Sequence, residues 1–321
     1  MHDVRWGMIG CGDVAEVKSG PGFRKARRSA LVAVMRRDRQ KAEDYAQRHG
    51  VTRVHATADQ LIEDERVDAV YIATHPDSHA DLACRVARAR KPCLVEKPMA
   101  VSHAECRRML EAFDAAGVPL WVAYYRRALP RFLVIRDLLR SGTVGRVTSV
   151  RLDLHQPLAR GEAARAWRMN REVAGGGLFH DMGSHSVDLL DFLFGPVEYA
   201  TGATLNTGGT YDVEDVTAAV FRLPGGVVAT GTWNFNAGMA ADELVLTGSE
   251  GEIRTAVFGD TDVVVTHAGG RQVHPVRNPP HVHQPLIQSI VDELAGRGVC
   301  ESTGVSGARA SRVLEMCVGG T

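Results

Sequence analysis

The 321-residue sequence predicts an α/β protein with two sheets: a doubly wound parallel sheet early in the chain and a large, mostly antiparallel sheet later. Two observations predict this fold class. Before Tyr125, short apolar runs alternate with stretches in which apolar residues recur at intervals of three and four. After Tyr125, most runs alternate between apolar and polar residues, and turns rich in glycine and proline separate them.

The strands predicted in the first part are apolar on successive residues, as expected when helices cover both faces of a sheet. Helical periodicity separates them, for example at His79–Arg90 and His103–Ala116. Strand, helix and strand at this spacing predict βαβ units and a parallel sheet. The predicted strands are Val4–Ile9, Leu31–Met35, a shorter one at Arg53–Ala56, Ala69–Ala73, Pro92–Glu96 and Leu120–Tyr124.

The second part begins with a predicted helix at Pro130–Leu139, and another is predicted at Gln284–Leu294. Since no low-complexity linker is present, we place the boundary at Tyr124, which predicts a dinucleotide-binding domain of residues 1–124 and a substrate-binding domain of residues 125–321. The strands predicted here are Val147–Leu154, Val197–Leu205, Val216–Leu223, Val227–Trp233, Glu243–Thr247, Ile253–Val257 and Val263–His267.

The composition argues against several classes of protein. Lys+Arg and Asp+Glu both number 38, so no basic excess indicates a nucleic-acid partner. No apolar window approaches the length of a membrane span, and the N-terminus lacks the plan of a signal peptide. The 6 cysteines are scattered without a C-x-x-C pair, which favours free thiols. We therefore expect a cytoplasmic protein with no membrane or nucleic-acid partner.

The first strand is followed directly by Gly10-Cys11-Gly12-Asp13-Val14-Ala15, a G-x-G-x-x-A pattern. In such a turn the first glycine allows the sharp bend and the second lets a pyrophosphate approach the backbone. The small third residue allows close packing of helix and strand. We interpret Gly10, Gly12, Asp13, Val14 and Ala15 as dinucleotide-binding; the alternative is a plain glycine-rich turn.

The end of the second strand bears on the choice of nucleotide. An NAD site usually has an acid there for the ribose 2′-hydroxyl, but this strand runs into Arg36 and Arg37, with Asp38 only after them. Guanidinium groups suit a 2′-phosphate. We expect NADP(H) to be preferred and NAD(H) to be possible. The alternative is that both arginines are solvated and Asp38 reaches the ribose.

Two further groups follow strands of the same predicted sheet, at the carboxyl edge where ligands bind. Thr74 and His75 follow the fourth strand, and we expect them, with His79, to contact the cofactor. Glu96, Lys97 and Pro98 end the fifth. Proline stops the ladder and disfavours helix at Lys97, so the lysine is held extended. A solvated strand end is the alternative.

A second cluster runs from Gly175 to Asp188, GGGLFHDMGSHSVD. If a helix begins near Asp181, then Asp181, His185 and Asp188 stand at i, i+4 and i+7 on one face. Carboxylates beside an imidazole suit a proton shuttle. The alternative is a capping Asp181 beside a buried, hydrogen-bonded His185.

A metal site is a third reading of the same cluster, formed by His180, Asp181 and His185 with His281 and His283. However, His180 and His185 are five residues apart, which turns them to different faces of a helix. We therefore expect no metal.

Three motifs occur in a fixed order along the chain: the G-x-G-x-x-A turn after the first strand, Glu96-Lys97-Pro98 after the fifth strand, and the cluster from Gly175 to Asp188. This ordered set resembles the Gfo/Idh/MocA family of oxidoreductases. That family includes glucose–fructose oxidoreductase, inositol dehydrogenases and many sugar reductases. The resemblance covers most of the chain and includes Glu214-Asp215. It implies a Rossmann domain followed by an α/β domain whose open sheet packs on another subunit. It therefore implies a homodimer or homotetramer formed through the C-terminal sheet.

The resemblance also implies roles for single residues. The family's catalytic lysine, aspartate and histidine match Lys97, Asp181 and His185. Glu96 matches a glutamate that meets the cofactor, and the Lys97–Pro98 bond resembles one that is cis in relatives.

Arginine and tyrosine can donate to sugar hydroxyls, and tryptophan can cover an apolar ring face. We expect substrate contacts from Tyr125 and Arg126 near the domain boundary and from Trp167 and Arg168 before the glycine run, in addition to the catalytic residues. Each of these four residues could equally have a structural role. The predicted substrate-binding residues are Lys97, Tyr125, Arg126, Trp167, Arg168, Asp181 and His185.

The expected function is an NADP(H)-dependent oxidoreductase that moves a hydride between nicotinamide and a sugar, cyclitol or related polyol or keto-sugar. His185 exchanges the hydroxyl proton, Lys97 donates a hydrogen bond to the reacting oxygen, and Asp181 holds the geometry. Two alternatives remain. One is glycoside hydrolysis through transient oxidation with a recycled nicotinamide, and the other is a sensor that binds NADP(H) without turnover.

Overall fold

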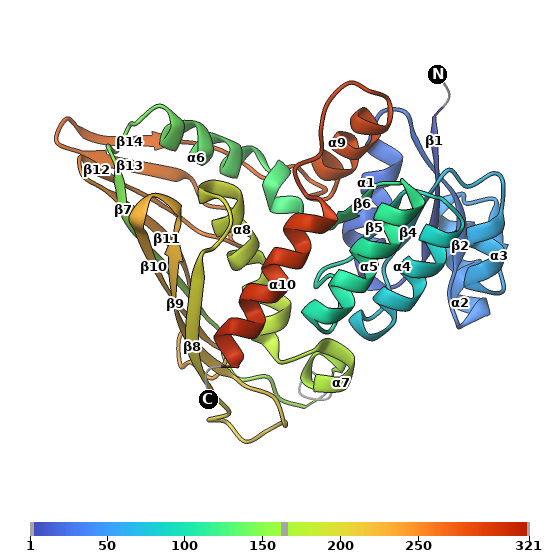
Figure 1. Ribbon diagram of the computed structural model, residues 1–321, viewed down its shortest axis with the longest axis horizontal. Coiled ribbons are helices and arrows are strands. Elements are labelled where there is room, and N and C mark those ends of the chain that lie inside the picture. Colours follow the sequence, from blue (N-terminus) through green and yellow to red (C-terminus); the bar gives the residue numbers. More distant parts are fainter. Residues whose placement is uncertain (1–2, 162–165, 320–321) are drawn as a thin grey trace. The chain divides into compact units, whose positions relative to one another are not determined.

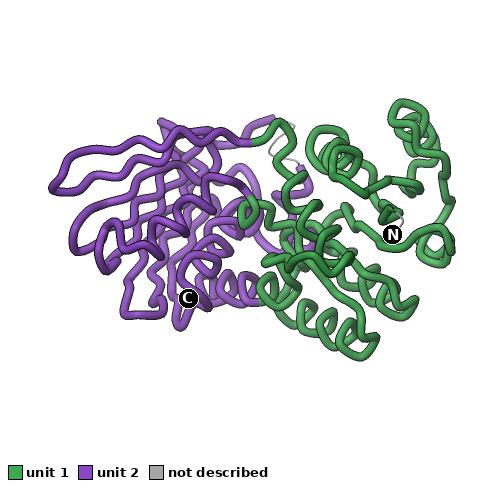
Figure 2. The backbone as a smooth tube through the Cα atoms, turned by 90° about the horizontal axis from the view of Figure 1, so that it is seen from above, with its two compact units in different colours: residues 1–128, 279–308 green, residues 129–278, 309–321 purple. Residues whose placement is uncertain are grey.

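The computed structural model describes residues 3–161 and 166–319, and the chain forms two compact units (Figure 2). Unit 1 contains Met1–Ala128 and Pro279–Ala308, and unit 2 contains Leu129–Asn278 and Arg309–Thr321. The boundary predicted at Tyr124 lies close to the first passage from unit 1 to unit 2. The return of Pro279–Ala308 to unit 1 has no counterpart in the predicted domains.

Unit 1 contains a six-stranded parallel sheet in the order β3-β2-β1-β4-β5-β6, as the sequence predicts (Figure 1). Helices α4 and α5 pack beside each other, as do α1 and α9. The elements are β1 (Val4–Ile9), α1 (Gly20–Lys25), β2 (Ser29–Met35), α2 (Arg39–His49), β3 (Arg53–His55), α3 (Ala58–Glu63), β4 (Ala69–Ile72), α4 (His79–Arg88), β5 (Cys93–Val95), α5 (His103–Ala116), β6 (Leu120–Val122) and α9 (Gln284–Leu294).

The core of unit 1 is built on aromatic rings from β1, α1 and β4. The centroids of Trp6 and Phe23 are 4.9 Å apart, and those of Phe23 and Tyr71 are 5.1 Å apart. All three side chains are fully buried. Rings of this size bury large apolar areas, so they join the first helix to the middle of the sheet.

Unit 2 contains an eight-stranded sheet in the order β14-β13-β12-β11-β7-β10-β9-β8. All neighbours in it are antiparallel except β7 and β10, which are parallel, so the predicted mostly antiparallel sheet is confirmed. The elements are α6 (Pro130–Arg140), β7 (Val147–His155), α7 (Arg171–Ala174), α8 (Ser184–Phe194), β8 (Tyr199–Leu205), β9 (Val216–Leu223), β10 (Val227–Asn234), β11 (Ala241–Gly248), β12 (Gly251–Thr255), β13 (Val263–His267), β14 (Gly270–His274) and α10 (Gly304–Val318), which begins in unit 1.

One face of this sheet is buried and the other is open, as the alternating burial along β9 and β10 shows. On the buried face Trp233 meets Phe179 at 4.8 Å between ring centroids, and its indole N–H donates to Ser186 Oγ of α8 at 3.4 Å. The alternation of apolar and polar residues therefore reflects the structure that the sequence suggests: every second side chain along a strand packs into the core, and those between face outward.

Several details of unit 2 differ from the predicted elements. The strand predicted at Ile253–Val257 ends earlier, because the carboxylate of Asp242 accepts the backbone N–H groups of Val257 and Phe258, each at 2.8 Å. Strand β14 and helix α10 were not predicted. β14 is a mostly exposed edge strand without an apolar alternation to reveal it.

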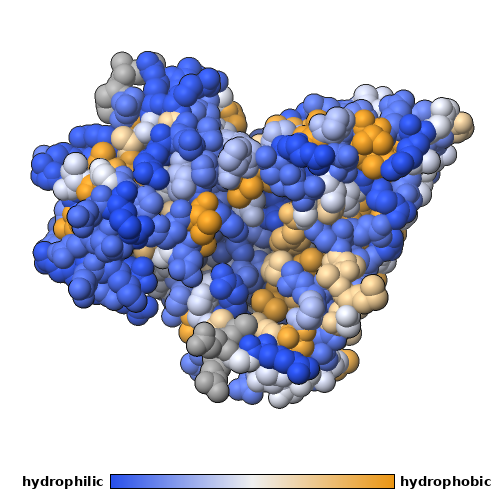
Figure 3. Space-filling view, turned by 180° about the vertical axis from the view of Figure 1, so that it is seen from behind, coloured by the Kyte–Doolittle hydropathy of each residue, from blue (hydrophilic) through white to orange (hydrophobic). Residues whose placement is uncertain are grey.

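The described residues contain no helix that is long and apolar enough to cross a membrane. On the face drawn in Figure 3, hydrophilic residues prevail and apolar residues form smaller groups. The six cysteines are free thiols.

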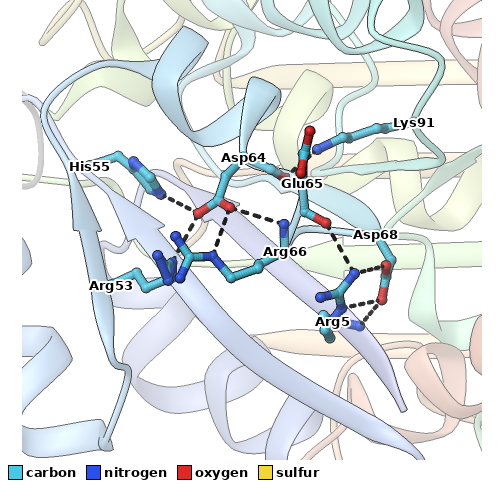
Figure 4. Close-up of polar contacts among 8 residues, drawn as sticks. All are labelled: Arg5, Arg53, His55, Asp64, Glu65, Arg66, Asp68 and Lys91. Atoms are coloured by element: carbon cyan, nitrogen blue, oxygen red, sulfur yellow. Dashed lines mark hydrogen bonds and ion pairs between the residues drawn. The ribbon is translucent and has the colours of Figure 1, made fainter. Parts of the chain in front are cut away.

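Polar contacts join strands β1 and β3 to the turn before β4 (Figure 4). The Asp64 carboxylate, of which 7% is exposed, accepts from Arg53 Nε at 3.0 Å and lies 3.1 Å from His55 Nε2. It also accepts the backbone N–H of Arg66 at 2.9 Å. Asp68 binds Arg5 of β1 through its guanidinium and its backbone N–H. These contacts connect β1 and β3 to the turn before β4.

We expect Asp64→Ala to lower the free energy of unfolding by about 1–3 kcal/mol, because Arg53, His55 and a backbone N–H lose their partner. Cofactor affinity should not change, since none of these side chains lines the cavity at the carboxyl ends of β1, β2 and β4. Urea unfolding and a cofactor titration measure the two effects. The exposed neighbour Glu65→Ala serves as a control. Equal stability of the two variants would contradict the assignment.

Candidate active site

A cavity of about 660 Å³ lies in unit 1 at the carboxyl ends of β1, β2 and β4. Its walls come from the turn after β1, the end of β2, the segment between β3 and α3, and the segment after β4. Six of the residues predicted to bind the cofactor line it: Gly10, Gly12, Arg36, Arg37, Thr74 and His75.

The two glycines of the turn are required for different reasons. Gly10 has a φ of +96°, and a Cβ there would lie 2.7 Å from the carbonyl oxygen of Ala73. A Cβ on Gly12 would meet nothing within 4 Å. Packing within the described chain therefore does not demand glycine at position 12. A bare backbone beside a cavity fits the approach of a pyrophosphate.

The end of β2 presents more positive than negative charge to the cavity. Arg36 donates from Nη1 to the carbonyl oxygen of Cys11 at 2.9 Å, which places its guanidinium beside the glycine turn. Arg37 and Lys41 also line the cavity. Asp38 lines it too, but its carboxylate caps α2 by accepting the backbone N–H of Lys41 at 3.1 Å. That bond, together with nearby Lys41 and Arg36, lowers the pKa of Asp38.

The residues after β4 are held by a local network. Ser78 Oγ donates to Thr74 Oγ1 at 2.7 Å and to the carbonyl oxygen of His75 at 2.9 Å. His79 does not line the cavity in the described chain. It is fully buried, and its ring nitrogens lie 3.1 Å from the carbonyl oxygens of Thr74 and Pro98. His79 therefore ties the segments after β4 and β5 together, and burial lowers its pKa.

The remaining residues of the glycine motif are not among those that line the cavity. Asp13 is exposed, whereas Ala15 is fully buried. The carbonyl oxygen of Ala15 accepts from the hydroxyl of Tyr45 on α2 at 3.4 Å. The small third residue of the motif thus has the packing role that the sequence predicts.

Glu96 follows β5 and is almost fully buried. It accepts from the hydroxyl of Tyr71 at 2.5 Å and from the backbone N–H of Lys97 at 3.2 Å. Burial raises its pKa, while Tyr71 and Lys97 oppose this effect. The Lys97–Pro98 bond is cis, as the resemblance implies.

Tyr125 and Arg126, in the turn η3 (Tyr125–Ala128), face a histidine that the sequence suggested only as a metal ligand. The rings of Tyr125 and His283 have centroids 4.6 Å apart, and His283 Nδ1 lies 3.7 Å from Glu96 Oε1. The guanidinium of Arg126 lies 4.9 Å from the centre of the Tyr125 ring. Burial, with the charges of Lys18, Lys97 and Arg126, lowers the pKa of His283 to about 3.

In unit 2, the glycine run is explained by close packing. A Cβ on Gly176 would lie 2.4 Å from the ring of His180, and one on Gly177 would lie 2.4 Å from the carbonyl oxygen of Glu214. A Cβ on Gly183 would lie 2.4 Å from the ring of Phe179. The run therefore brings the backbone against the turn that carries the predicted catalytic residues.

Glu214 anchors this run from a neighbouring segment. Its Oε1 accepts the backbone N–H of Gly177 at 2.7 Å, and its Oε2 accepts from Arg171 at 3.0 Å. His180 is buried beside it, and burial lowers the pKa of His180 while Glu214 opposes the shift. Asp215 holds the loop between β8 and β9 by accepting the backbone N–H groups of Thr207 and Gly208.

A helix begins near Asp181, as the sequence predicts, but its first turn is not α-helical. Phe179–Gly183 forms a π-helical turn (η6), and the α-helix α8 begins only at Ser184. His185 and Asp188 therefore share α8, whereas Asp181 precedes it. All three side chains are buried. A π-helical turn holds more residues than an α-helical one, so the angle between Asp181 and His185 around the helix axis differs from that of an α-helix.

Asp181 is bound by one of the predicted substrate residues. Arg168, in the turn η5 (Trp167–Met169), donates from Nε to Asp181 Oδ2 at 2.8 Å. The Arg168 guanidinium lies 4.4 Å from the centre of the Trp167 ring. Trp167 and Arg168 thus form one group with Asp181.

The structure gathers the predicted residues into groups within each unit. Lys97 belongs to unit 1, and Asp181 and His185 belong to unit 2. The alternative metal ligands are divided in the same way, since His281 and His283 lie in unit 1. Among the described residues, no three His, Cys, Asp or Glu side chains are placed so that they could hold a metal ion.

Several residues of these groups escape prediction from the sequence. Lys41 and Arg85 line the cavity from helices α2 and α4, where charged residues usually mark a solvated face. Glu214 was noted only as part of the resemblance, because its contact with Gly177 spans 37 residues. A long-range contact of this kind leaves no local pattern.

The two units match two family models. One, described as an oxidoreductase family with an NAD-binding Rossmann fold, matches residues 4–124, and one described as a GFO/IDH/MocA C-terminal domain matches residues 132–254. The chain is 40% identical over 291 residues to an oxidoreductase from Formosa agariphila, with 90% of each chain covered. The chain belongs to the Gfo/Idh/MocA family of oxidoreductases.

Membership of the Gfo/Idh/MocA family makes this protein an NAD(P)-binding oxidoreductase, and the residues around the cavity fit such a cofactor. The chain is also 28% identical to 1,5-anhydro-D-fructose reductase from Ensifer adhaerens, over 94% of this chain and 92% of that protein. Levoglucosan dehydrogenase, solved in complex with NADH and levoglucosan, shares the fold with a TM-score of 0.88 at 21% identity, covering 99% of this chain and 97% of that one.

The lowered pKa of His283 predicts a dependence of stability on pH. Its ordinary value is 6.5 and its folded value is about 3, so between these values the unfolded chain binds the proton more readily. The folded protein therefore loses stability as the pH falls through this window. His283→Phe keeps a ring against Tyr125 and removes the titration.

We expect the Tm of His283→Phe to gain on that of the wild type as the pH falls below about 6.5. Scanning calorimetry in a series of buffers measures this difference. Glu96 is present in both proteins, so its own titration largely cancels in the comparison. A Tm difference that is constant with pH would show that His283 does not titrate as stated.

Proposed function

We propose that this protein is an NADP(H)-dependent oxidoreductase that moves a hydride between nicotinamide and a sugar, cyclitol or related polyol or keto-sugar. One observation carries the proposal: a cavity in a Rossmann unit combines a bare glycine turn with two arginines at the end of β2. The relative named 1,5-anhydro-D-fructose reductase supports a sugar-like substrate.

The bound cofactor would supply or accept the hydride, and the protein would supply position, hydrogen bonds and a proton site. Gly10 and Gly12 would leave room for the pyrophosphate, and Arg36 would bind the 2′-phosphate of the ribose. Lys97 would donate a hydrogen bond to the reacting oxygen and stabilise its negative charge. His185 would take the hydroxyl proton during oxidation and return it during reduction.

Asp181 would act as a positioning residue in this scheme. Its ion pair with Arg168 fixes the carboxylate on the π-helical turn just before His185. Trp167, packed on the Arg168 guanidinium, would contact the substrate. Tyr125 and Arg126 would be further substrate-binding residues.

The contacts around β2 support the choice of NADP(H). Arg36 is anchored beside the glycine turn, and Arg37 and Lys41 add positive charge to the same cavity. Asp38, the acid that would bind a ribose 2′-hydroxyl, is occupied as the cap of α2. Forked guanidinium donors suit a phosphate better than a hydroxyl.

We also propose that the protein forms a homodimer or homotetramer through the open face of the unit 2 sheet. Tyr199, Val220 and Val228 are large apolar residues on β8, β9 and β10, and between 45% and 50% of each is exposed. Their strands are neighbours in the sheet. The free thiols support a location in a reducing cytoplasm.

We expect Lys97→Ala and His185→Ala to lower turnover by about 10²-fold or more, because each removes a group that acts on the reacting oxygen or its proton. The Kd for NADP(H) should stay within a few-fold of wild type. Screening polyols, sugars and keto-sugars by cofactor absorbance, with exposed Lys25→Ala as a control, tests this. Near wild-type turnover in both variants would refute the assignment.

We expect the wild type to bind NADP(H) more tightly than NAD(H), and Arg36→Ala to weaken NADP(H) binding by about tenfold or more. NAD(H) binding should change much less, because it lacks the 2′-phosphate. Fluorescence titration of the four pairs measures this, with exposed Arg27→Ala as a matched control. Equal affinity of the wild type for both cofactors would contradict the proposed preference for NADP(H).

A further inference from the structure

The loop Ala256–Asp262, which joins β12 to β13 in unit 2, is held in place by an aspartate of β11. The Asp242 carboxylate accepts three successive backbone N–H groups of this loop: those of Val257 and Phe258 at 2.8 Å each, and that of Gly259 at 2.6 Å. Surface loops are usually more mobile than the strands they join. Hydrogen bonds from three successive residues to one carboxylate restrict this loop strongly.

The same loop is anchored a second time, from α6. Arg131 is buried, and its Nη1 donates to the carbonyl oxygen of Gly259 and to that of Thr261, the latter at 3.3 Å. Thr261 Oγ1 also accepts the backbone N–H of Ala256 at 2.9 Å, which closes the loop on itself. The conformation of the loop is therefore fixed by elements on two sides of it.

The anchored loop presents one aromatic side chain to the predicted catalytic histidine. The rings of Phe258 and His185 have centroids 5.9 Å apart, and their planes meet at 81°, which is an edge-to-face arrangement. His185 is buried and Phe258 is half-buried. Edge-to-face pairs at this separation are favourable and have a preferred orientation. Phe258 therefore restricts the directions in which the imidazole can turn.

The position of His185 in its helix gives this contact its importance. His185 is the second residue of α8 and follows the π-helical turn directly. The next residue, Ser186, is held by the indole N–H of Trp233. That bond positions the backbone of the first turn, whereas the direction of the imidazole depends on its own side-chain torsions and contacts.

The loop is separate from the cofactor cavity. In the part of the chain that the structure describes, no residue of Ala256–Asp262 lines the cavity at β1, β2 and β4. The hydride transfer proposed above also assigns no role to Asp242, Arg131 or Phe258. A change in the loop should therefore alter the behaviour of His185 without altering cofactor binding.

We propose, building on the function proposed above, that Phe258 is a positioning residue for proton transfer by His185. Its ring holds the imidazole in the orientation that exchanges a proton with the substrate hydroxyl. Asp242 and Arg131 act at one remove, because they fix the backbone that carries Phe258. A proton donor must be aligned with its acceptor, so an imidazole that turns more freely is productive for less of the time.

The experiment compares three variants of the full chain with the wild type. Phe258→Leu removes the ring, and Phe258→Tyr keeps it. Asp242→Asn replaces one accepting oxygen by a donor and leaves the Phe258 side chain in place, so it tests the same contact even if Phe258→Leu folds poorly.

Two controls match these changes. Phe194→Leu alters a half-buried phenylalanine at the far end of α8. Asp262→Asn alters an aspartate of the same loop that pairs with Arg277 at 3.1 Å.

Two measurements are made on each protein. Turnover is followed by cofactor absorbance, with 1,5-anhydro-D-fructose and NADPH and with myo-inositol and NADP⁺. The order parameter of the His185 ring is obtained from ¹³C relaxation of labelled histidine, with the signal assigned by its loss in His185→Ala.

We expect Phe258→Leu to lower kcat by about tenfold or more, because the imidazole is misaligned for part of the time. The KM values should stay within about twofold of wild type, because binding is not affected. Asp242→Asn should lower kcat by a smaller factor, and Phe258→Tyr should keep most of it. The order parameter of the His185 ring should fall in Phe258→Leu and stay at the wild-type value in both controls.

A double variant separates positioning from a general loss of stability. In a His185→Ala background, Phe258→Leu should change kcat by no more than about twofold, because two residues that act as a unit are not additive. A full further loss in the double variant would show that Phe258 acts independently of His185, which would overturn the inference.

Other results would also overturn it: wild-type kcat in Phe258→Leu, an equal loss of kcat in Phe258→Leu and Phe194→Leu, or an unchanged order parameter of the His185 ring in Phe258→Leu. The order parameter decides even if neither substrate reacts. Failure of the proposed function is distinguishable. Wild-type kcat in Phe258→Leu with loss of kcat in His185→Ala removes only the inference, whereas undiminished turnover in His185→Ala removes the proposed role of His185 and the inference with it.

Discussion

The candidate site of unit 1 depends on a row of backbone hydrogen bonds that joins the carboxyl ends of its parallel strands. Gly10 N–H donates to Met35, Ala73 N–H to Ile9, Glu96 N–H to Ile72, and Ala123 N–H to Val95, each at 2.8 Å. Each bond ties the residue that leaves one strand to the last residues of its neighbour. The glycine turn, the Thr74 segment, Glu96 and the Tyr125 turn are therefore positioned by the sheet itself. The backbone of the sheet therefore sets where the side chains at this edge lie.

Local patterns were sufficient to predict the framework of both units. Apolar runs between helical stretches predict the parallel sheet because burial on both faces leaves a continuous apolar signal. Alternation predicts the second sheet for the opposite reason, since one of its faces is open. The glycine turn is visible because backbone bends and bare backbone restrict the residue type at each position. Arg36 and Arg37 stand out because they break an apolar strand at its end.

Features that depend on distant contacts were not predictable in the same way. The π-helical turn Phe179–Gly183 shifts Asp181 out of the regular helix, and its packing involves Trp233 and Glu214, which lie far along the chain. Lys18 looks like any solvated lysine until the fold brings Tyr125 beneath it. His283 contacts Tyr125 only because Pro279–Ala308 returns to unit 1. In each case the partner that defines the environment of the residue lies far along the chain, so no local sequence pattern reveals it.

The two glycines of the first turn are under different kinds of constraint, although they are separated by a single residue. Gly10 is needed by the polypeptide for its own folding, because any side chain there strains the backbone against Ala73. A Cβ on Gly12 would meet no atom of the described residues, so a bare backbone there fits the demand of a bound molecule. In evolutionary terms, a descendant that stopped using a nucleotide could let position 12 drift at once. Position 10 would remain glycine for as long as the sheet survived.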